Sequence, residues 1–124
     1  MDKNKIPDFL GTCTINTSLH LEELSTIVSS KLLGGLPFTY GKHSIWEEIP
    51  SMYIEHSILG LLVIIGGYGG EDGYSIEISL YGNYSRFLSF SNIDTERISL
   101  DKYLYFLLKD ALINHPEIKI VEPI

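Results

Sequence analysis

The sequence has almost no cysteine and no long apolar run, and both absences restrict what the protein can be. Because Cys13 is the only cysteine, the chain cannot form an internal disulfide or a cysteine-based metal site. So few cysteines are typical of proteins in a reducing compartment. The longest apolar run, Ile58–Ile65, is interrupted by Gly60 and is far shorter than the ~20 residues of a membrane-spanning helix. The start of the chain, Met1–Pro7, is polar and lacks the apolar run of a signal peptide. We therefore expect a soluble, cytoplasmic protein.

Positive charge is absent from the 43 residues between Lys42 and Arg86. That stretch contains six carboxylates, which are Glu47, Glu48, Glu55, Glu71, Asp72 and Glu77. The net charge of the whole chain is −7, so almost all of the imbalance lies in this segment. A surface of one sign repels nucleic acid and anionic membranes and attracts basic partners. The alternative is a solvated acidic surface that only keeps the protein soluble.

Length and composition predict one folded domain, residues 1–124. At 124 residues with 44% apolar side chains, the chain is long enough to bury a hydrophobic core and too apolar to be disordered.

Two segments have the apolar spacing of amphipathic helices. In the first the apolar positions are Leu21, Leu24, Ile27, Val28 and Leu32, and in the second they are Leu100, Tyr103, Leu104, Leu107, Leu108, Ala111 and Leu112. Ser25 and Ser29 are expected on the exposed side of the first helix. One of residues 16–18 is expected as its N-cap, and Gly34-Gly35 as its end. Ser99 is expected to cap the second helix.

The remaining pattern is β-forming. The candidate strands are Phe9–Ile15, Phe38–Tyr40, Ile45–Glu47, Met52–Glu55, Leu59–Ile65, Tyr74–Tyr81, Arg86–Phe90 and Ile118–Val121. Tyr74–Tyr81 alternates most clearly, with Ile76 and Ile78 on one face and Ser75 and Glu77 on the other. We expect the order β-α-β-β-β-β-β-α-β: an α+β two-layer sandwich whose mostly antiparallel sheet carries both helices on one face. The opposite face is left to solvent or a partner.

The stretch Gly66–Gly73 contains five glycines in eight residues. It has no lysine, carries Glu71 and Asp72, and precedes a strand, which excludes a phosphate-binding loop. We predict a hairpin that uses positive φ angles, with Tyr68 beside the two carboxylates as a binding loop.

No pattern predicts catalysis, a cofactor or a metal site. His43, Glu47, Glu55 and His56 lack a metal-ligand spacing. Cys13 is expected to be a buried core residue, and His20 and His115 to be surface or capping residues. Trp46 is expected in the core, with partner contact as the alternative.

In size, acidity and α+β plan, and in the segments Trp46–Ile54 and Gly66–Gly73, the chain resembles the small cytoplasmic immunity proteins of bacterial toxin–immunity systems, particularly those of contact-dependent growth inhibition. The resemblance implies a stoichiometric inhibitor, not an enzyme, that covers the basic active-site cleft of a toxin domain, often a nuclease. The expected partner-binding residues are Glu47, Glu48, Tyr53, Glu55, Tyr68, Glu71, Asp72 and Glu77. The alternatives are a small-ligand or peptide binding domain that uses the open sheet face, and a degenerate enzyme with a carboxylate pair.

Overall fold

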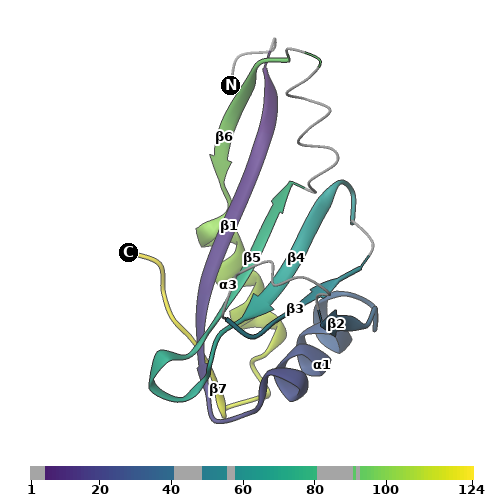
Figure 1. Cartoon of the computed structure of the whole chain (residues 1–124). Coiled ribbons are helices and arrows are strands. Elements are labelled where there is room, and N and C mark those ends of the chain that lie inside the picture. Colours follow the sequence, from purple (N-terminus) through teal and green to yellow (C-terminus); the bar gives the residue numbers. More distant parts are fainter. Residues whose placement is uncertain (1–4, 41–48, 56–57, 81–90, 92) are drawn as a thin grey trace.

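A computed structural model describes residues 5–40, 49–55, 58–80, 91 and 93–124. One seven-stranded sheet carries two helices (Figure 1). In chain order the elements are β1 (Ile6–Thr17), α1 (Leu21–Leu32), β2 (Phe38–Tyr40), β3 (Ser51–Ile54), β4 (Leu61–Gly66), the 3-10 turn η1 (Gly70–Asp72), β5 (Tyr74–Leu80), β6 (Thr95–Ser99), α3 (Asp101–Ala111) and β7 (Ile118–Ile120). The α+β class is confirmed. The described elements also follow the expected order of helices and strands, although the strand before α3 is β6, which was not among the candidate strands.

The sheet is built around β1, its longest strand. The strand order is β2-β3-β4-β5-β1-β6, with β7 also paired to β1. Only the β1–β6 pairing is parallel among the described strands. One edge of β1 pairs with β5 along Leu10–Ile15, while the other pairs with β6 along Ile6–Leu10 and with β7 along Ile15–Thr17. Partners at both ends make β1 longer than the expected Phe9–Ile15.

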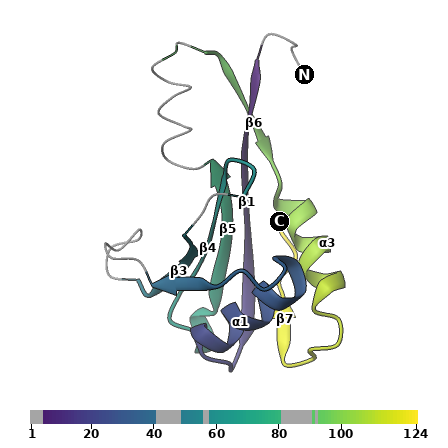
Figure 2. The ribbon, with the colours of Figure 1, turned by 90° about the vertical axis from the view of Figure 1, so that its right-hand side faces the viewer.

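Both helices pack on the same face of the sheet. One cluster of buried side chains joins Leu24 of α1 and Leu108 of α3 to Ile15, Ile65 and Ile76 of the sheet. Figure 2 shows α3 standing on one side of β1, with α1 crossing the lower end of the sheet. Burying a side chain of this size contributes roughly 1.5–3 kcal/mol. The two-layer arrangement therefore follows from two amphipathic helices covering one apolar sheet face.

Strand β6 has no counterpart in the sequence prediction, which treated Ser99 only as a helix cap. The segment Thr95–Ser99 is mostly polar, so its own pattern gives no strand signal. It is held by parallel pairing with β1, and Arg97 forms an ion pair with Asp8 at 3.0 Å. This strand exists because β1 offers an unpaired edge.

Helix α1 begins later and buries more polar groups than the sequence indicates. Its N-cap is His20, whose backbone N–H donates to Glu23 Oε1 at 3.2 Å, so the expectation of a cap within residues 16–18 is wrong. Ser25 and Ser29 are buried, contrary to expectation, because residues 36–40 return along that side of the helix. Ser29 Oγ donates to the Leu36 carbonyl there.

The glycine-rich hairpin is confirmed, since β4 and β5 are antiparallel and the glycines that connect them have positive φ angles. Strand β4 begins at Leu61 rather than at the predicted Leu59, whose φ of 52° places it in a turn. Of the predicted features, Ile45–Glu47, Trp46 and Arg86–Phe90 lie outside the described residues.

Candidate functional site

The sheet face opposite the helices carries two of the predicted partner-binding residues in one row. Strand register places Glu77 of β5 and Tyr53 of β3 on either side of Ile64 of β4. Neighbouring strands lie about 4.8 Å apart, so the two residues are separated by about 10 Å across the sheet. Ile64 itself is only 2% exposed. Tyr53 and Glu77 therefore lie on one side of the sheet with a buried residue between them. No described helix covers this side, which we call the open face.

At one end of the open face, the β4–β5 connection is held tightly by its glycines. A Cβ atom at Gly67 would lie 2.6 Å from the Gly73 carbonyl oxygen, and one at Gly73 would lie 2.5 Å from Asn16 Oδ1. A Cβ at Gly69 would lie 2.7 Å from the hydroxyl of Tyr74. The contact at Gly67 is with backbone, and a Cβ at Gly73 would also lie 2.8 Å from the Ile15 carbonyl oxygen, so movement of a side chain would not relieve either one. The loop therefore packs against β1 and β5 because it has glycine at these positions.

This loop presents the predicted acidic pair and an aromatic ring. Glu71 and Asp72 form the exposed η1 turn, and Tyr68 is 64% exposed. Tyr68 and Asp72 also line one side of a hollow of about 260 Å³ on the open face. Thr14, Ile49 and Ser75 line the rest of this hollow, together with the backbone of the loop. The loop thus brings a ring and a carboxylate to one small depression.

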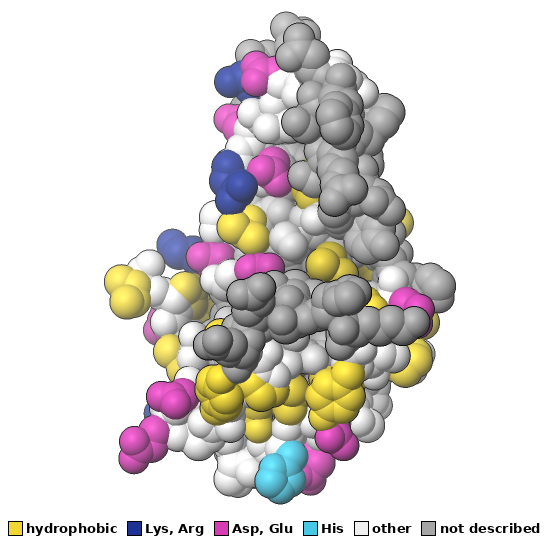
Figure 3. Space-filling model, viewed as in Figure 1, with side chains coloured by type: hydrophobic (Ala, Val, Ile, Leu, Met, Phe, Trp, Pro, Cys, Tyr) yellow, Lys and Arg dark blue, Asp and Glu magenta, His cyan; other side chains and the backbone are white. Residues whose placement is uncertain are grey.

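The remaining acidic positions do not join this loop. Glu55 is exposed and directly follows β3, while Glu47 and Glu48 lie outside the described residues. Figure 3 shows hydrophobic side chains in a band across the lower part of the face opposite α3, with carboxylates in separate groups around it. Among the described residues, the carboxylates on this side of the molecule do not form one continuous patch (Figure 3).

The described residues contain no group of three or more His, Cys, Asp or Glu side chains placed to hold a metal ion. Of the four residues weighed for a metal, only Glu55 is described, and it is exposed. Cys13 is buried, as expected, and burial, with a smaller effect of the Asp101 carboxylate, raises the pKa of its thiol to about 11. A thiol with that pKa is protonated at neutral pH, so Cys13 is a poor nucleophile.

Sequence reasoning missed a second set of polar residues, on the helix side of the sheet. Glu22 and Ser25 of α1 line a hollow with Phe38 and Tyr40 of β2. The Tyr40 hydroxyl donates to the Glu22 carboxylate, and this hydrogen bond raises the pKa of Tyr40. The one feature of the sequence that could have indicated this hollow is the position of Ser25 and Ser29 beside the apolar stripe of the helix.

Comparison with protein-family models, curated proteins and solved structures gave no match to this chain. Among the described residues, neither helix is long and apolar enough to cross a membrane. The functional assignment therefore depends on the surfaces described above.

Proposed function

We propose that this chain is an immunity protein that binds and neutralises a bacterial toxin domain through the open face of its sheet. The observation that carries the proposal is the charge of one part of that face, made by strands β2 to β5 and the loops between them. From β2 through β5, the described residues include Glu55, Glu71, Asp72 and Glu77 and no Lys or Arg. A nuclease toxin needs a basic cleft to hold its substrate, and a face of this charge is complementary to such a cleft.

The arrangement suits a stoichiometric inhibitor. The loop with Tyr68, Glu71 and Asp72 is folded before binding, so little conformational entropy is lost when a partner docks. Hydrophobic side chains beside separate carboxylates (Figure 3) are also common in protein–protein interfaces, and tyrosines such as Tyr68 are common anchors in them. In this mechanism the carboxylates pair with basic residues of the toxin, the face blocks the substrate, and no reaction takes place on this chain.

The test is protection from a toxin. We expect a toxin gene immediately upstream of the gene for this protein. The toxin domain that it encodes is expressed in a bacterial host with and without this protein, and growth is followed. We expect the toxin domain alone to stop growth, and its co-expression with this protein to restore growth. The purified pair should form a one-to-one complex by light scattering. Unrestored growth together with no complex would contradict the proposal.

A small-ligand or peptide binding domain is the second candidate, favoured by the hollow of about 260 Å³ on the open face. Its size is near the lower end of ligand pockets, which are about 300–1,000 Å³. The two functions differ in their partner, because an immunity protein binds a folded toxin domain and loses that binding when the acidic loop is reversed in charge.

A further inference from the structure

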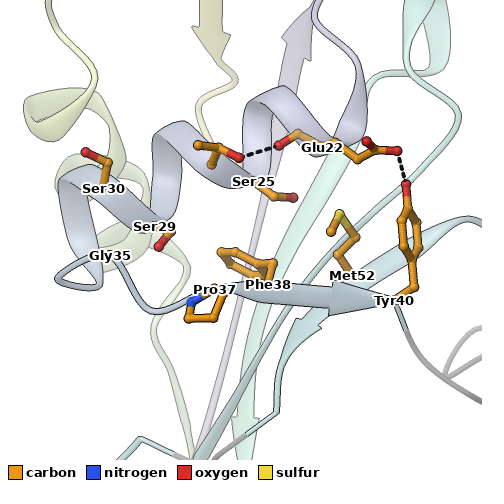
Figure 4. A pocket seen from close by; sticks show the side chains of 10 residues that line it. Glu22, Ser25, Ser29, Ser30, Gly35, Pro37, Phe38, Tyr40 and Met52 are labelled. Carbon is orange, nitrogen blue, oxygen red and sulfur yellow. Dashed lines mark hydrogen bonds between the residues drawn. The ribbon is translucent and has the colours of Figure 1, made fainter.

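A second hollow lies between α1 and β2, away from the open face. It has a volume of about 420 Å³. This is within the range of about 300–1,000 Å³ that is typical of small-molecule sites. Figure 4 shows its walls: side chains of α1 on one side, and Phe38, Tyr40 and Met52 on the other.

The lining combines an apolar surface with a carboxylate that is held in place. Phe38 and Met52 supply the apolar part. Glu22 and Tyr40 are joined across the hollow by the hydrogen bond from the tyrosine hydroxyl (Figure 4). That bond uses one carboxylate oxygen and leaves the second oxygen of Glu22 to accept from a ligand.

Ser25 supplies the second, independent indication of a ligand. It is 1% exposed, and its Oγ has no hydrogen-bond partner among the described residues. Figure 4 shows its hydroxyl directed into the space between α1 and β2. The neighbouring Ser29 is also buried but donates to the Leu36 carbonyl, so only Ser25 is left unsatisfied in this wall. An unpaired buried hydroxyl is destabilising and rare in folded proteins.

We propose that this hollow binds a small primary amine that has an apolar body and a second hydrogen-bonding group. The ammonium pairs with the Glu22 carboxylate, the apolar body lies on Phe38 and Met52, and the second group bonds to Ser25 Oγ. The net charge of −7 also attracts a cation to the protein. This site is independent of the proposed toxin interface, so either can fail without the other.

The test is a titration of the ¹⁵N-labelled full chain with three matched probes, followed by NMR. Tyramine has both polar groups, 2-phenylethylamine lacks the hydroxyl, and 4-ethylphenol lacks the ammonium. We expect tyramine to shift the amide signals of residues around the hollow, such as Ser25, Gly35 and Phe38. Each truncated probe should bind about tenfold more weakly, because each lacks one hydrogen-bonding group.

Two substitutions assign the contacts. Glu22→Gln keeps an acceptor for Tyr40 but removes the charge, so it should lower the affinity for tyramine about tenfold. Tyramine and 4-ethylphenol should then bind this variant with similar affinity. Ser25→Ala should make tyramine and 2-phenylethylamine bind alike. Asp110→Asn, which removes one charge from the exposed side of α3, is the control and should leave all three affinities unchanged.

Circular dichroism confirms that each variant is folded. The proposal is overturned by the absence of shifts around the hollow at millimolar tyramine, or by equal binding of the three probes. It is also overturned if tyramine binds Glu22→Gln or Ser25→Ala as well as it binds the unchanged protein.

Discussion

The side chain of Asp101 accepts a hydrogen bond from the backbone N–H of Thr12, with Oδ1 2.9 Å from the nitrogen. Asp101 is the first residue of α3, and Thr12 lies on the edge of β1 between the stretches paired with β6 and β7. Two residues further along β1, the Thr14 carbonyl accepts from the Val121 N–H at 2.9 Å. The gap between the two partner strands is thus closed by the start of α3 and the segment after β7.

Replacing Asp101 should therefore destabilise the protein. Asp101→Ala leaves the Thr12 N–H without its acceptor and removes a favourable charge from the first turn of α3, so we expect a loss of about 1–2 kcal/mol in the free energy of unfolding. Asp101→Asn keeps an acceptor oxygen and should lose less. Urea denaturation measures both, and equal losses in the two variants would contradict this role.

Because the pKa of Cys13 is raised, the stability of the protein should fall as the pH rises through the alkaline range. Burial, and secondarily the charge of Asp101, raises the pKa of the thiol from 9.0 to about 11 in the folded protein. The folded state thus favours the neutral thiol, and this contribution is complete below pH 9.0 and is lost as the pH rises to about 11. The stability difference between the unchanged protein and Cys13→Ala should therefore shrink from about pH 8 to about pH 10.5. A constant difference would contradict the prediction.

Two glycines of the acidic loop give a matched pair of substitutions. Gly70 and Gly73 have φ angles of 61° and 67°, but a Cβ at Gly70 meets no atom within 4 Å, whereas one at Gly73 would lie 2.8 Å from the backbone carbonyl oxygen of Ile15. Gly70→Ala should cost about 1–2 kcal/mol for the backbone alone. Gly73→Ala should cost more, since the loop must also move away from β1. Thermal unfolding compares them, and equal costs would contradict the tight packing.

The three leucines of α3 should differ in their effect on stability. Leu104 and Leu108 are 3% and 0% exposed, whereas Leu107 is only half-buried. Leu104→Ala and Leu108→Ala should each lower the free energy of unfolding by about 2–5 kcal/mol. Leu107→Ala should lower it less. Chemical denaturation of the three variants tests this order.

Charge reversal tests the proposed interface with the toxin. Glu71→Lys combined with Asp72→Lys should slow association with a basic toxin domain, and the remaining rate should depend less on salt. The fold should be unaffected, because exposed charges on a loop contribute little to stability. The control is Asp94→Lys with Asp110→Lys, which changes the net charge equally at exposed positions outside the acidic loop. Association is measured by stopped flow. Equal slowing by both double variants would contradict a specific role of the acidic loop, because only net charge would then set the association rate.

The sequence determined the features that repeat locally. The alternation along Tyr74–Leu80 and the apolar stripes of α1 and α3 follow from the periods of strands and helices, and they sufficed for the α+β class and the single covered face. The glycines of residues 66–73 likewise indicated the hairpin and its exposed acidic turn. Each of these depends on neighbours in the chain, so the residues themselves carry the information.

Tertiary structure alone decided the features made by distant segments. Strand β6 forms because β1 offers it an edge, and the row with Glu77 and Tyr53 depends on strand register. Ser25 of α1 was expected to be exposed and is buried, because β2 returns along the helix and places Tyr40 opposite Glu22. Hydrophobic periodicity reports which side of an element is apolar, but it does not report which later segment covers the polar residues beside that stripe.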